Sequence, residues 1–245
     1  MGARPVTDDV NAHRAVGRLI EDLAGIRRRI ESVERAWDHE VEIVAVTKAF
    51  DPSIVDLAVD AGCRAIGENY AQDLLSKRDV IEAFDHDRRP RVDFIGRLQS
   101  NKVRQLAGLV DRWATVDRAS LAREISKRDP GAEVLVQVNA TGEPDKGGCD
   151  PDDVAALLKT CRDRGLCAVG LLGIGPTGQP PEAAATAFTI VRALVDEHGL
   201  DVCSMGMTAD LEVAVRCGAT SVRVGSALFG SRPGGPVHQQ SGERG

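Results

Sequence analysis

The sequence predicts an α/β protein that folds as a single (β/α)8 barrel, also called a TIM barrel, with an extra helix at its N-terminus. Eight short apolar runs follow one another along the 245-residue chain. Amphipathic stretches with helical periodicity separate them, as expected of repeated βα units around a parallel sheet. The chain length also matches that of a typical barrel, although an open doubly wound sheet is the structural alternative.

The chain opens with an amphipathic segment from Val10 to about Arg35, in which apolar residues recur at helical spacing. These residues are Val16, Leu19, Ile20, Leu23, Ile26, Ile30 and Val33. We therefore expect one long helix before the first strand. We expect residues 1–245 to form a single domain, in which residues 1–9 and the polar, Gly/Pro-rich residues 233–245 are flexible tails.

The eight apolar runs are the expected strands of the barrel. They are IVAVT (43–47), RAIG (64–67), VDFIG (92–96), RWATV (112–116), EVLVQVN (133–139), CAVGLLGI (167–174), DVCSMGM (201–207) and TSVRVG (220–225). Helix caps are expected between them. Asp51 and Asp150 each precede a proline, and Thr208 precedes a helical pattern that should end at Gly218.

Composition argues against several classes of protein. Hydrophobic residues make up 42% of the chain and charged residues 28%, which suits a large buried core. A formal net charge of -6 leaves no cationic excess to attract nucleic acid or an anionic membrane. There is no membrane-spanning run and no apolar core of a signal peptide. The six cysteines form no CxxC pair, so we expect a cytoplasmic protein without a metal site or disulfides.

The functional groups of a barrel gather at the C-terminal ends of its strands. Lys48 directly follows the first expected strand and should project toward the barrel mouth. Partial desolvation there would lower its pKa and favour Schiff-base chemistry with an aldehyde. On spacing alone, a solvated lysine at a strand end is the simpler interpretation.

The loops after strands seven and eight of a barrel often bind phosphate. Here the first contains Ser204, Gly206 and Thr208 before a helix, and the second contains Gly225, which lets backbone amides come close to an anion. Together they predict a phosphate site. Taken separately, such residues are usually caps and turns.

Other polar residues fall near the same end of the expected barrel. Arg223 lies within the eighth apolar run, where a guanidinium needs an anion, an acceptor or a structural ion pair. Asn69 follows the second run, and Gln99, Asn101 and Lys102 follow the third. From position alone, Asn69, Gln99, Asn101 and Lys102 are simply loop residues.

Several segments resemble, in the same order, those of the YggS/PROSC family, the pyridoxal phosphate homeostasis proteins. The segments are VAVTKAF (44–50), AIGENYAQDLL (65–75), FIGRLQSNK (94–102), LVQVNATGEPDKGG (135–148), GLLGIGP (170–176) and SMGMTADLEVAVRCGATSVRVGSALFG (204–230). The resemblance extends from about residue 40 to 232. Two positions depart from the family pattern, since Asp93 stands where His is usual and Leu172 where Met is usual. We expect these two changes to leave cofactor binding intact and to alter at most the rim of the site.

The resemblance implies a barrel like the N-terminal domain of alanine racemase, with pyridoxal 5'-phosphate (PLP) held as an internal aldimine on Lys48. It implies that the phosphate lies against the two late loops and that Arg223 faces the pyridine nitrogen. The expected cofactor-binding residues are Lys48, Asn69, Ser204, Met205, Thr208, Arg223, Gly225 and Ser226. No catalytic residue and no metal ligand are expected.

Three functional interpretations are open for these residues. Arginine is a poor proton donor to the pyridine nitrogen, and a racemase needs a second acid/base group, whereas this chain has a single tyrosine, Tyr70. We therefore expect a non-catalytic protein that carries or buffers PLP in vitamin B6 and amino-acid homeostasis, acts as a monomer and exchanges the cofactor with apo-enzymes. A PLP-dependent amino-acid racemase or lyase is the alternative, and a phosphosugar-binding barrel without PLP is the third interpretation.

Overall fold

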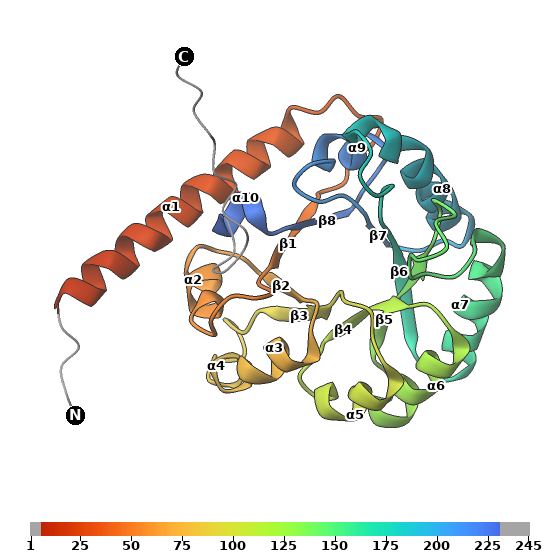
Figure 1. Ribbon diagram of the computed structural model, residues 1–245, viewed down its shortest axis with the longest axis horizontal. Coiled ribbons are helices and arrows are strands. Elements are labelled where there is room, and N and C mark those ends of the chain that lie inside the picture. The colour runs from red at the N-terminus through yellow and green to blue at the C-terminus, as the bar shows by residue number, and fades with distance from the viewer. Residues whose placement is uncertain (1–5, 231–245) are drawn as a thin grey trace, which may run out of the picture.

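A computed structural model describes residues 6–230 and shows the predicted closed barrel (Figure 1). All neighbouring strands are parallel, and β8 pairs with β1 to close the sheet. The strands are β1 (Glu42–Val46), β2 (Ala65–Glu68), β3 (Arg91–Phe94), β4 (Arg112–Val116), β5 (Glu133–Val138), β6 (Cys167–Gly173), β7 (Val202–Ser204) and β8 (Ser221–Val224). Every predicted strand is therefore present. Of the predicted tails, residues 1–5 and 233–245 lie outside the described residues, whereas residues 6–9 belong to helix α1, which begins at Val6.

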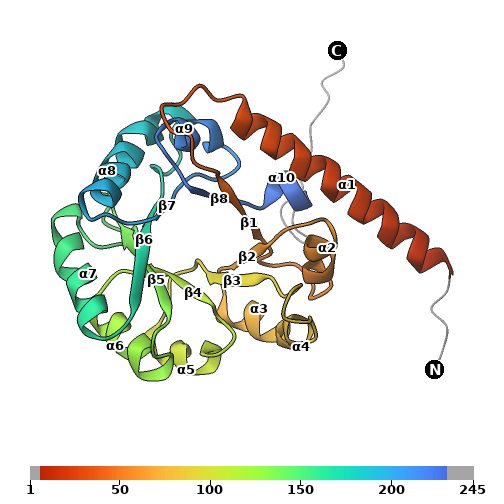
Figure 2. The same ribbon diagram turned by 180° about the vertical axis from the view of Figure 1, so that it is seen from behind.

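Helices surround the barrel and connect its strands. They are α1 (Val6–Glu31), α2 (Ile54–Asp60), α3 (Ala71–Ser76), α4 (Arg78–Glu82), α5 (Val103–Leu106), α6 (Ala119–Arg128), α7 (Val154–Asp163), α8 (Ala184–Glu197), α9 (Leu211–Arg216) and α10 (Ser226–Phe229), with 3-10 turns at Ser100–Lys102, Pro151–Asp153 and Pro181–Ala183. The extra helix α1 crosses the outside of the barrel beside α2, α9 and α10 (Figure 2). Its apolar stripe is core, because Leu19, Leu23, Ile26 and Ile30 are buried.

The structure confirms two of the four predicted helix caps. Asp150 accepts a hydrogen bond from Asp152 N, and Gly218 adopts φ +91° directly after the C-cap of α9. Asp51 accepts from Ser53 N, although α2 begins only at Ile54. The prediction for Thr208 is wrong, because α9 begins at Leu211 and Asp210 takes the N-cap position.

The strand β7 is shorter than predicted and ends at Ser204, although the Met205 N–H still donates to the Ser221 carbonyl at 3.1 Å and the Gly206 carbonyl accepts from Arg223 N at 3.0 Å. Gly206 adopts φ +91°, a left-handed conformation that a glycine adopts without strain. A Cβ atom at this position would also lie only 2.4 Å from the Cβ of Ala214. The left-handed backbone at Gly206 therefore ends the regular strand and starts the loop at the barrel mouth.

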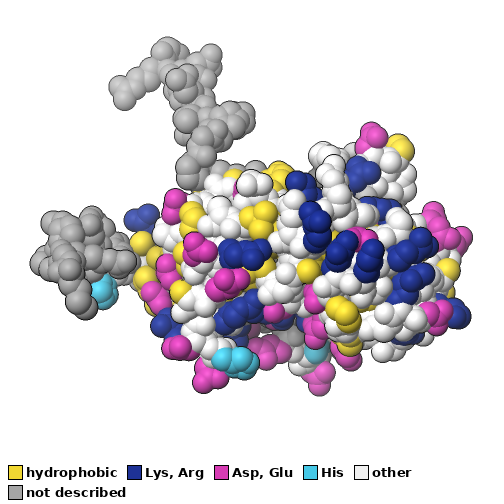
Figure 3. Space-filling model, turned by 90° about the horizontal axis from the view of Figure 1, so that it is seen from below, with side chains coloured by type: hydrophobic (Ala, Val, Ile, Leu, Met, Phe, Trp, Pro, Cys, Tyr) yellow, Lys and Arg dark blue, Asp and Glu magenta, His cyan; other side chains and the backbone are white. Residues whose placement is uncertain are grey.

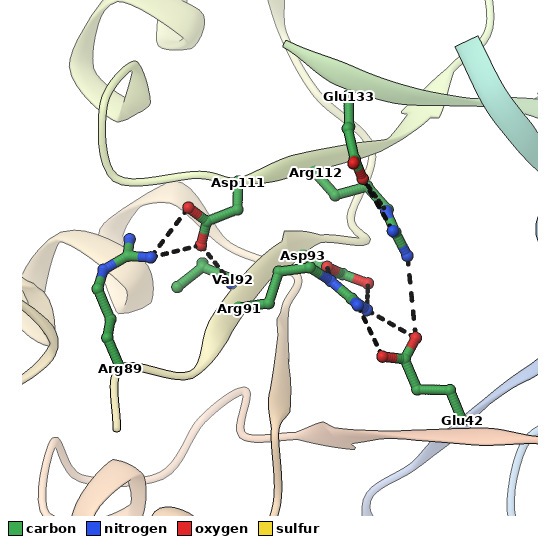
Figure 4. A network of polar contacts seen from close by, with 8 residues as sticks. All are labelled: Glu42, Arg89, Arg91, Val92, Asp93, Asp111, Arg112 and Glu133. Atoms are coloured by element: carbon green, nitrogen blue, oxygen red, sulfur yellow. Dashed lines mark hydrogen bonds and ion pairs between the residues drawn. The ribbon is translucent and has the colours of Figure 1, made fainter. Parts of the chain in front are cut away.

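The N-terminal end of the barrel interior is filled by charged side chains (Figure 4). Arg91 donates hydrogen bonds to both oxygens of Glu42, at 2.6 and 2.8 Å, and to both oxygens of Asp93, at 2.7 and 3.0 Å. Arg112 donates to Glu133 at 2.8 Å. Each of these carboxylates is therefore paired with a guanidinium.

The two departures from the family pattern lie within the barrel and not at the rim of the pocket. Asp93 is 3% exposed and pairs with Arg91 in the network at the N-terminal end. Leu172 packs with Ala114 and Leu135 in a small apolar cluster inside the barrel. Neither residue lines the pocket at the mouth.

The surface carries side chains of both signs. Figure 3 shows Lys and Arg side chains gathered in a band on the right of one face, with Asp and Glu around it. Among the helices of residues 6–230, none combines the length and the apolar character that crossing a membrane requires.

The six cysteines are all free thiols, and we expect them to differ strongly in reactivity. Burial raises the pKa of Cys63 and Cys161 to about 11 and that of Cys149 and Cys203 to about 12. Cys167, at the start of β6, is exposed. Iodoacetamide at pH 8 should therefore modify Cys167 first, and mass spectrometry of the peptides would show it. Equally fast labelling of Cys203 in the folded protein would contradict this packing.

Candidate cofactor site

A pocket of about 470 Å³ opens at the C-terminal ends of the barrel strands. Six of the eight expected cofactor-binding residues line it, namely Lys48, Asn69, Thr208, Arg223, Gly225 and Ser226. They come from β8 and from the loops after β1, β2, β7 and β8, so the fold brings together residues that are up to 178 positions apart. Ser204 and Met205 do not line the pocket.

The backbone on both sides of Lys48 is held by side chains from the region of α3. The Thr47 carbonyl accepts a hydrogen bond from Lys77 Nζ at 2.7 Å, and the Ala49 N–H donates to Asp73 Oδ2 at 2.8 Å. Ala49 adopts φ +63°, which a residue with a Cβ atom adopts only at a cost. These two contacts fix the turn that directs the half-buried Lys48 into the pocket.

The Lys77 ammonium also belongs to a buried ion pair beneath this turn. It lies 2.5 Å from Glu68 Oε1, which in addition accepts a hydrogen bond from Thr47 Oγ1 at 2.6 Å. The Lys77 and Glu68 side chains are both 0% exposed. Burial raises the pKa of Glu68, while Lys77 and Thr47 act in the opposite direction. The pair links the ends of β1 and β2, and so the two pocket residues Lys48 and Asn69.

Arg223 brings a buried positive charge from β8 to the pocket. Its Nη1 donates to Ser204 Oγ at 2.8 Å and its Nη2 donates to the Gly173 carbonyl at 3.0 Å. Burial lowers the pKa of Arg223 to about 10, so the guanidinium stays charged at neutral pH. Ser204 therefore holds Arg223 in place without lining the pocket itself.

The two late loops meet at one side of the pocket, as expected for a phosphate site. Ser226 Oγ donates a hydrogen bond to Thr208 Oγ1 at 3.3 Å, which joins the loop after β7 to the loop after β8. At Gly225 an added Cβ atom would lie 3.4 Å from Val46, so glycine keeps this wall open. Helix α1 supports the loop as well, because Arg29 donates to the Thr208 carbonyl at 3.1 Å and pairs with Glu212 at 2.7 Å.

Met205 points away from the pocket. Ser204 and Met205 are neighbours at the end of a strand, where successive side chains face opposite sides of the sheet. Ser204 faces the barrel interior, so Met205 lies in the main core and is 0% exposed. Met207, two residues further on, is 45% exposed and lines the pocket.

The walls of the pocket include residues that the sequence did not single out. Val46, Ile95 and Ile174 form apolar surfaces, and Phe50, Met207, Ala209 and Gly230 complete the lining. Val46 lies two residues before Lys48, so the period of two in β1 would have identified it. Ile95 and Ile174 directly follow β3 and β6, and the order of the strands would have placed them at the mouth.

Asn69 is held in place by the loop after β3, and Gly96 makes this contact possible. A Cβ atom at Gly96 would lie 1.9 Å from the Asn69 carbonyl oxygen. We expect Gly96→Ala to lower the free energy of unfolding by about 1–3 kcal/mol, because the two backbones must separate. Urea unfolding would measure it. Gly17→Ala on α1 is the control, since an added Cβ atom there would meet nothing within 4 Å beyond the nearby backbone of its own helix, and an equal loss in both variants would contradict the prediction.

Comparisons with known proteins agree with this geometry. The family model for the N-terminal domain of alanine racemase matches residues 22–233. The pyridoxal phosphate homeostasis protein of Pseudomonas aeruginosa is 36% identical over 228 residues, which cover 87% of this chain and 96% of that protein. The protein of the same name from Aquifex aeolicus is 35% identical over 226 residues, covering 86% and 97%.

A solved structure is similar as well. PipY of Synechococcus elongatus PCC7942, determined with PLP bound, superimposes with a TM-score of 0.72 at 28% sequence identity. The match covers 86% of this chain and 100% of PipY. From the family model and the curated relatives, the chain belongs to the family of pyridoxal phosphate homeostasis proteins, whose barrel is that of the alanine racemase N-terminal domain.

Proposed function

We propose that this protein binds PLP covalently on Lys48 and carries or buffers the cofactor without catalysing turnover. One observation carries the proposal. Among the described residues, the only side chains lining the pocket that bear a titratable group are Lys48 and Arg223. The pocket thus offers one amine for an aldehyde and one fixed cation, with no further group to exchange protons with a substrate.

The residues of the pocket fit PLP. The apolar walls formed by Val46, Ile95 and Ile174 suit an aromatic ring, and Thr208, Gly225 and Ser226 would hold the phosphate. Asn69 Oδ1 is buried without a hydrogen-bond partner, so it is free to accept one from a bound molecule. The volume of about 470 Å³ is that of a small-molecule site.

When bound, PLP supplies an aldehyde that condenses with a primary amine and a pyridine ring that can withdraw electrons. Lys48 contributes the amine, and the contacts of Thr47 and Ala49 keep it directed into the pocket. Arg223 would face the ring nitrogen. Its guanidinium is charged at neutral pH and offers no acceptor, so it does not hold a proton on that nitrogen as a carboxylate would.

The racemase alternative requires an acid/base group on each face of the substrate. Tyr70 is the only tyrosine of the chain, and its side chain lines a neighbouring groove instead of this pocket. The pocket therefore favours binding over racemisation. We further propose that the protein acts as a monomer in the cytoplasm and gives PLP to apo-enzymes, since an open mouth permits exchange and an exposed free thiol such as Cys167 suits a reducing compartment.

The experiment for this proposal is transfer of the cofactor. The PLP-loaded protein, freed of unbound PLP, is mixed with an apo-aminotransferase, and recovery of aminotransferase activity is followed over time. We expect recovery from the wild type and none from an equally treated Lys48→Ala variant. In parallel, L-alanine is incubated with the loaded protein and its D-isomer is measured. Cofactor-dependent formation of D-alanine that disappears in Lys48→Ala would instead establish the racemase alternative.

A further inference from the structure

A second groove lies beside the cofactor pocket on the same end of the barrel. Its volume is about 700 Å³, and Asn69 borders both spaces. We call it the Arg97 groove. The argument uses six of its lining residues, which are Tyr70, Gln72, Arg97, Gln99, Lys102 and Arg118. They come from the start of α3 and from the loops after β3 and β4.

The loop that carries Arg97 is fixed on both sides of this residue. The Gly96 carbonyl accepts a buried hydrogen bond from Thr115 Oγ1 at 2.6 Å. The Leu98 carbonyl accepts one from Arg118 Nη2 at 3.0 Å. Because both neighbouring peptide groups are held, the groove exists before any ligand arrives, and less conformational entropy is lost on binding.

The groove carries positive charge that the described residues do not neutralise. Asp117 is its one carboxylate, and it forms an ion pair with Arg118 at 2.5 Å. By contrast, neither the Arg97 nor the Lys102 side chain makes an ion pair or a hydrogen bond with another residue of 6–230. The chain as a whole has a net charge of -6, so the positive charge of this groove is opposite in sign to the net charge of the protein.

Hydrogen-bonding groups accompany the two cations. The side-chain amides of Gln72 and Gln99 form no hydrogen bond within residues 6–230, and neither does the hydroxyl of Tyr70. Tyr70 is 55% exposed and lies at the rim of the groove. An arginine fork, an ammonium, amide N–H groups and a phenol are together the donors that bind carboxylate or phosphate oxygens.

We propose that the Arg97 groove binds a small dianion, that is, a molecule with two carboxylates or a phosphate monoester, beside the cofactor pocket. Arg97 and Lys102 supply the two charges, and the amides and the phenol supply further hydrogen bonds. The site does not depend on the amine of Lys48, so it stands separately from the function proposed above.

The test is calorimetric titration of the PLP-loaded protein at low ionic strength with glutarate and, separately, with inorganic phosphate. Glutarate has no amine and cannot react with an aldehyde, and loading with PLP keeps phosphate out of the cofactor pocket. We compare the wild type with the double variant Arg97→Gln/Lys102→Gln. Arg104→Gln is the matched control, because Arg104 is an exposed residue of the adjacent α5 that does not line the groove.

We expect saturable 1:1 binding of at least one of the two dianions to the wild type and to Arg104→Gln. In the double variant this binding should weaken at least about tenfold, and the choice between glutarate and phosphate identifies the anionic group. Absence of saturable binding of both dianions would overturn the proposal, as would unchanged affinity in the double variant. If the wild type fails to take up PLP, the same titrations still decide the proposal, because the groove variants locate the site.

Discussion

We expect Lys77→Met to lower the free energy of unfolding by about 3–5 kcal/mol, the cost of leaving one charge of a buried ion pair without its partner. Lys77 and Glu68 are both 0% exposed, and their charged atoms lie 2.5 Å apart. Methionine fills a similar volume but donates no hydrogen bond, so Glu68 Oε1 and the Thr47 carbonyl both lose a donor. Urea unfolding at neutral pH would measure the loss.

The same variant should show a characteristic dependence on pH. Burial already raises the pKa of Glu68, and removal of Lys77 raises it further. A carboxyl group with a raised pKa in the folded state binds more protons than in the unfolded chain, so stability falls as the pH rises through that range. The deficit of Lys77→Met should therefore be smaller at pH 5 than at pH 8.

Two control variants identify the cause of this effect. Lys159→Met removes one partner of an exposed i,i+4 pair with Asp163, whose side chains are 74% and 60% exposed, and should change stability little. Glu68→Gln/Lys77→Met removes both buried charges and should recover part of the loss. A Lys159→Met variant as unstable as Lys77→Met would contradict the importance of burial.

We expect Lys48→Ala to abolish covalent attachment of PLP and to weaken its binding by at least about 100-fold, which corresponds to about 3 kcal/mol. The phosphate contacts of Thr208 and Ser226 remain, so weak non-covalent binding persists. The measurement is the visible absorbance that remains after dialysis. Lys127→Ala, at an exposed lysine of α6, should retain the cofactor like the wild type. Retention of the absorbance by Lys48→Ala would show that another amine holds PLP.

The sequence predicted the barrel because each of its strands is an apolar run between turn or helix signals. Such local patterns determine secondary structure without reference to distant residues. RWATV is an example, since β4 has the predicted bounds at Arg112 and Val116. It also predicted most of the cofactor pocket, because the C-terminal ends of parallel strands share one edge. Ser204 and Met205 were placed less well. Their roles depend on where β7 ends and on which side each residue faces.

The buried pair of Lys77 and Glu68 could not be predicted from local patterns. Lysine and glutamate are almost always exposed, and in the sequence Lys77 resembles an ordinary residue at a helix end. Only the packing of α3 against β2 brings its ammonium to the Thr47 carbonyl at the end of β1. The strained turn at Ala49 is equally invisible, since alanine rarely adopts a positive φ.

The central claim is that Lys48 holds PLP, and the most direct measurement is borohydride reduction of the PLP-loaded wild type followed by peptide mass mapping. We predict a visible absorbance band that disappears on reduction, with the added mass on the peptide that contains Lys48. Label on a different lysine, or no label after incubation with PLP, would contradict the claim. The absence of any label would make the phosphosugar-binding barrel the interpretation to pursue.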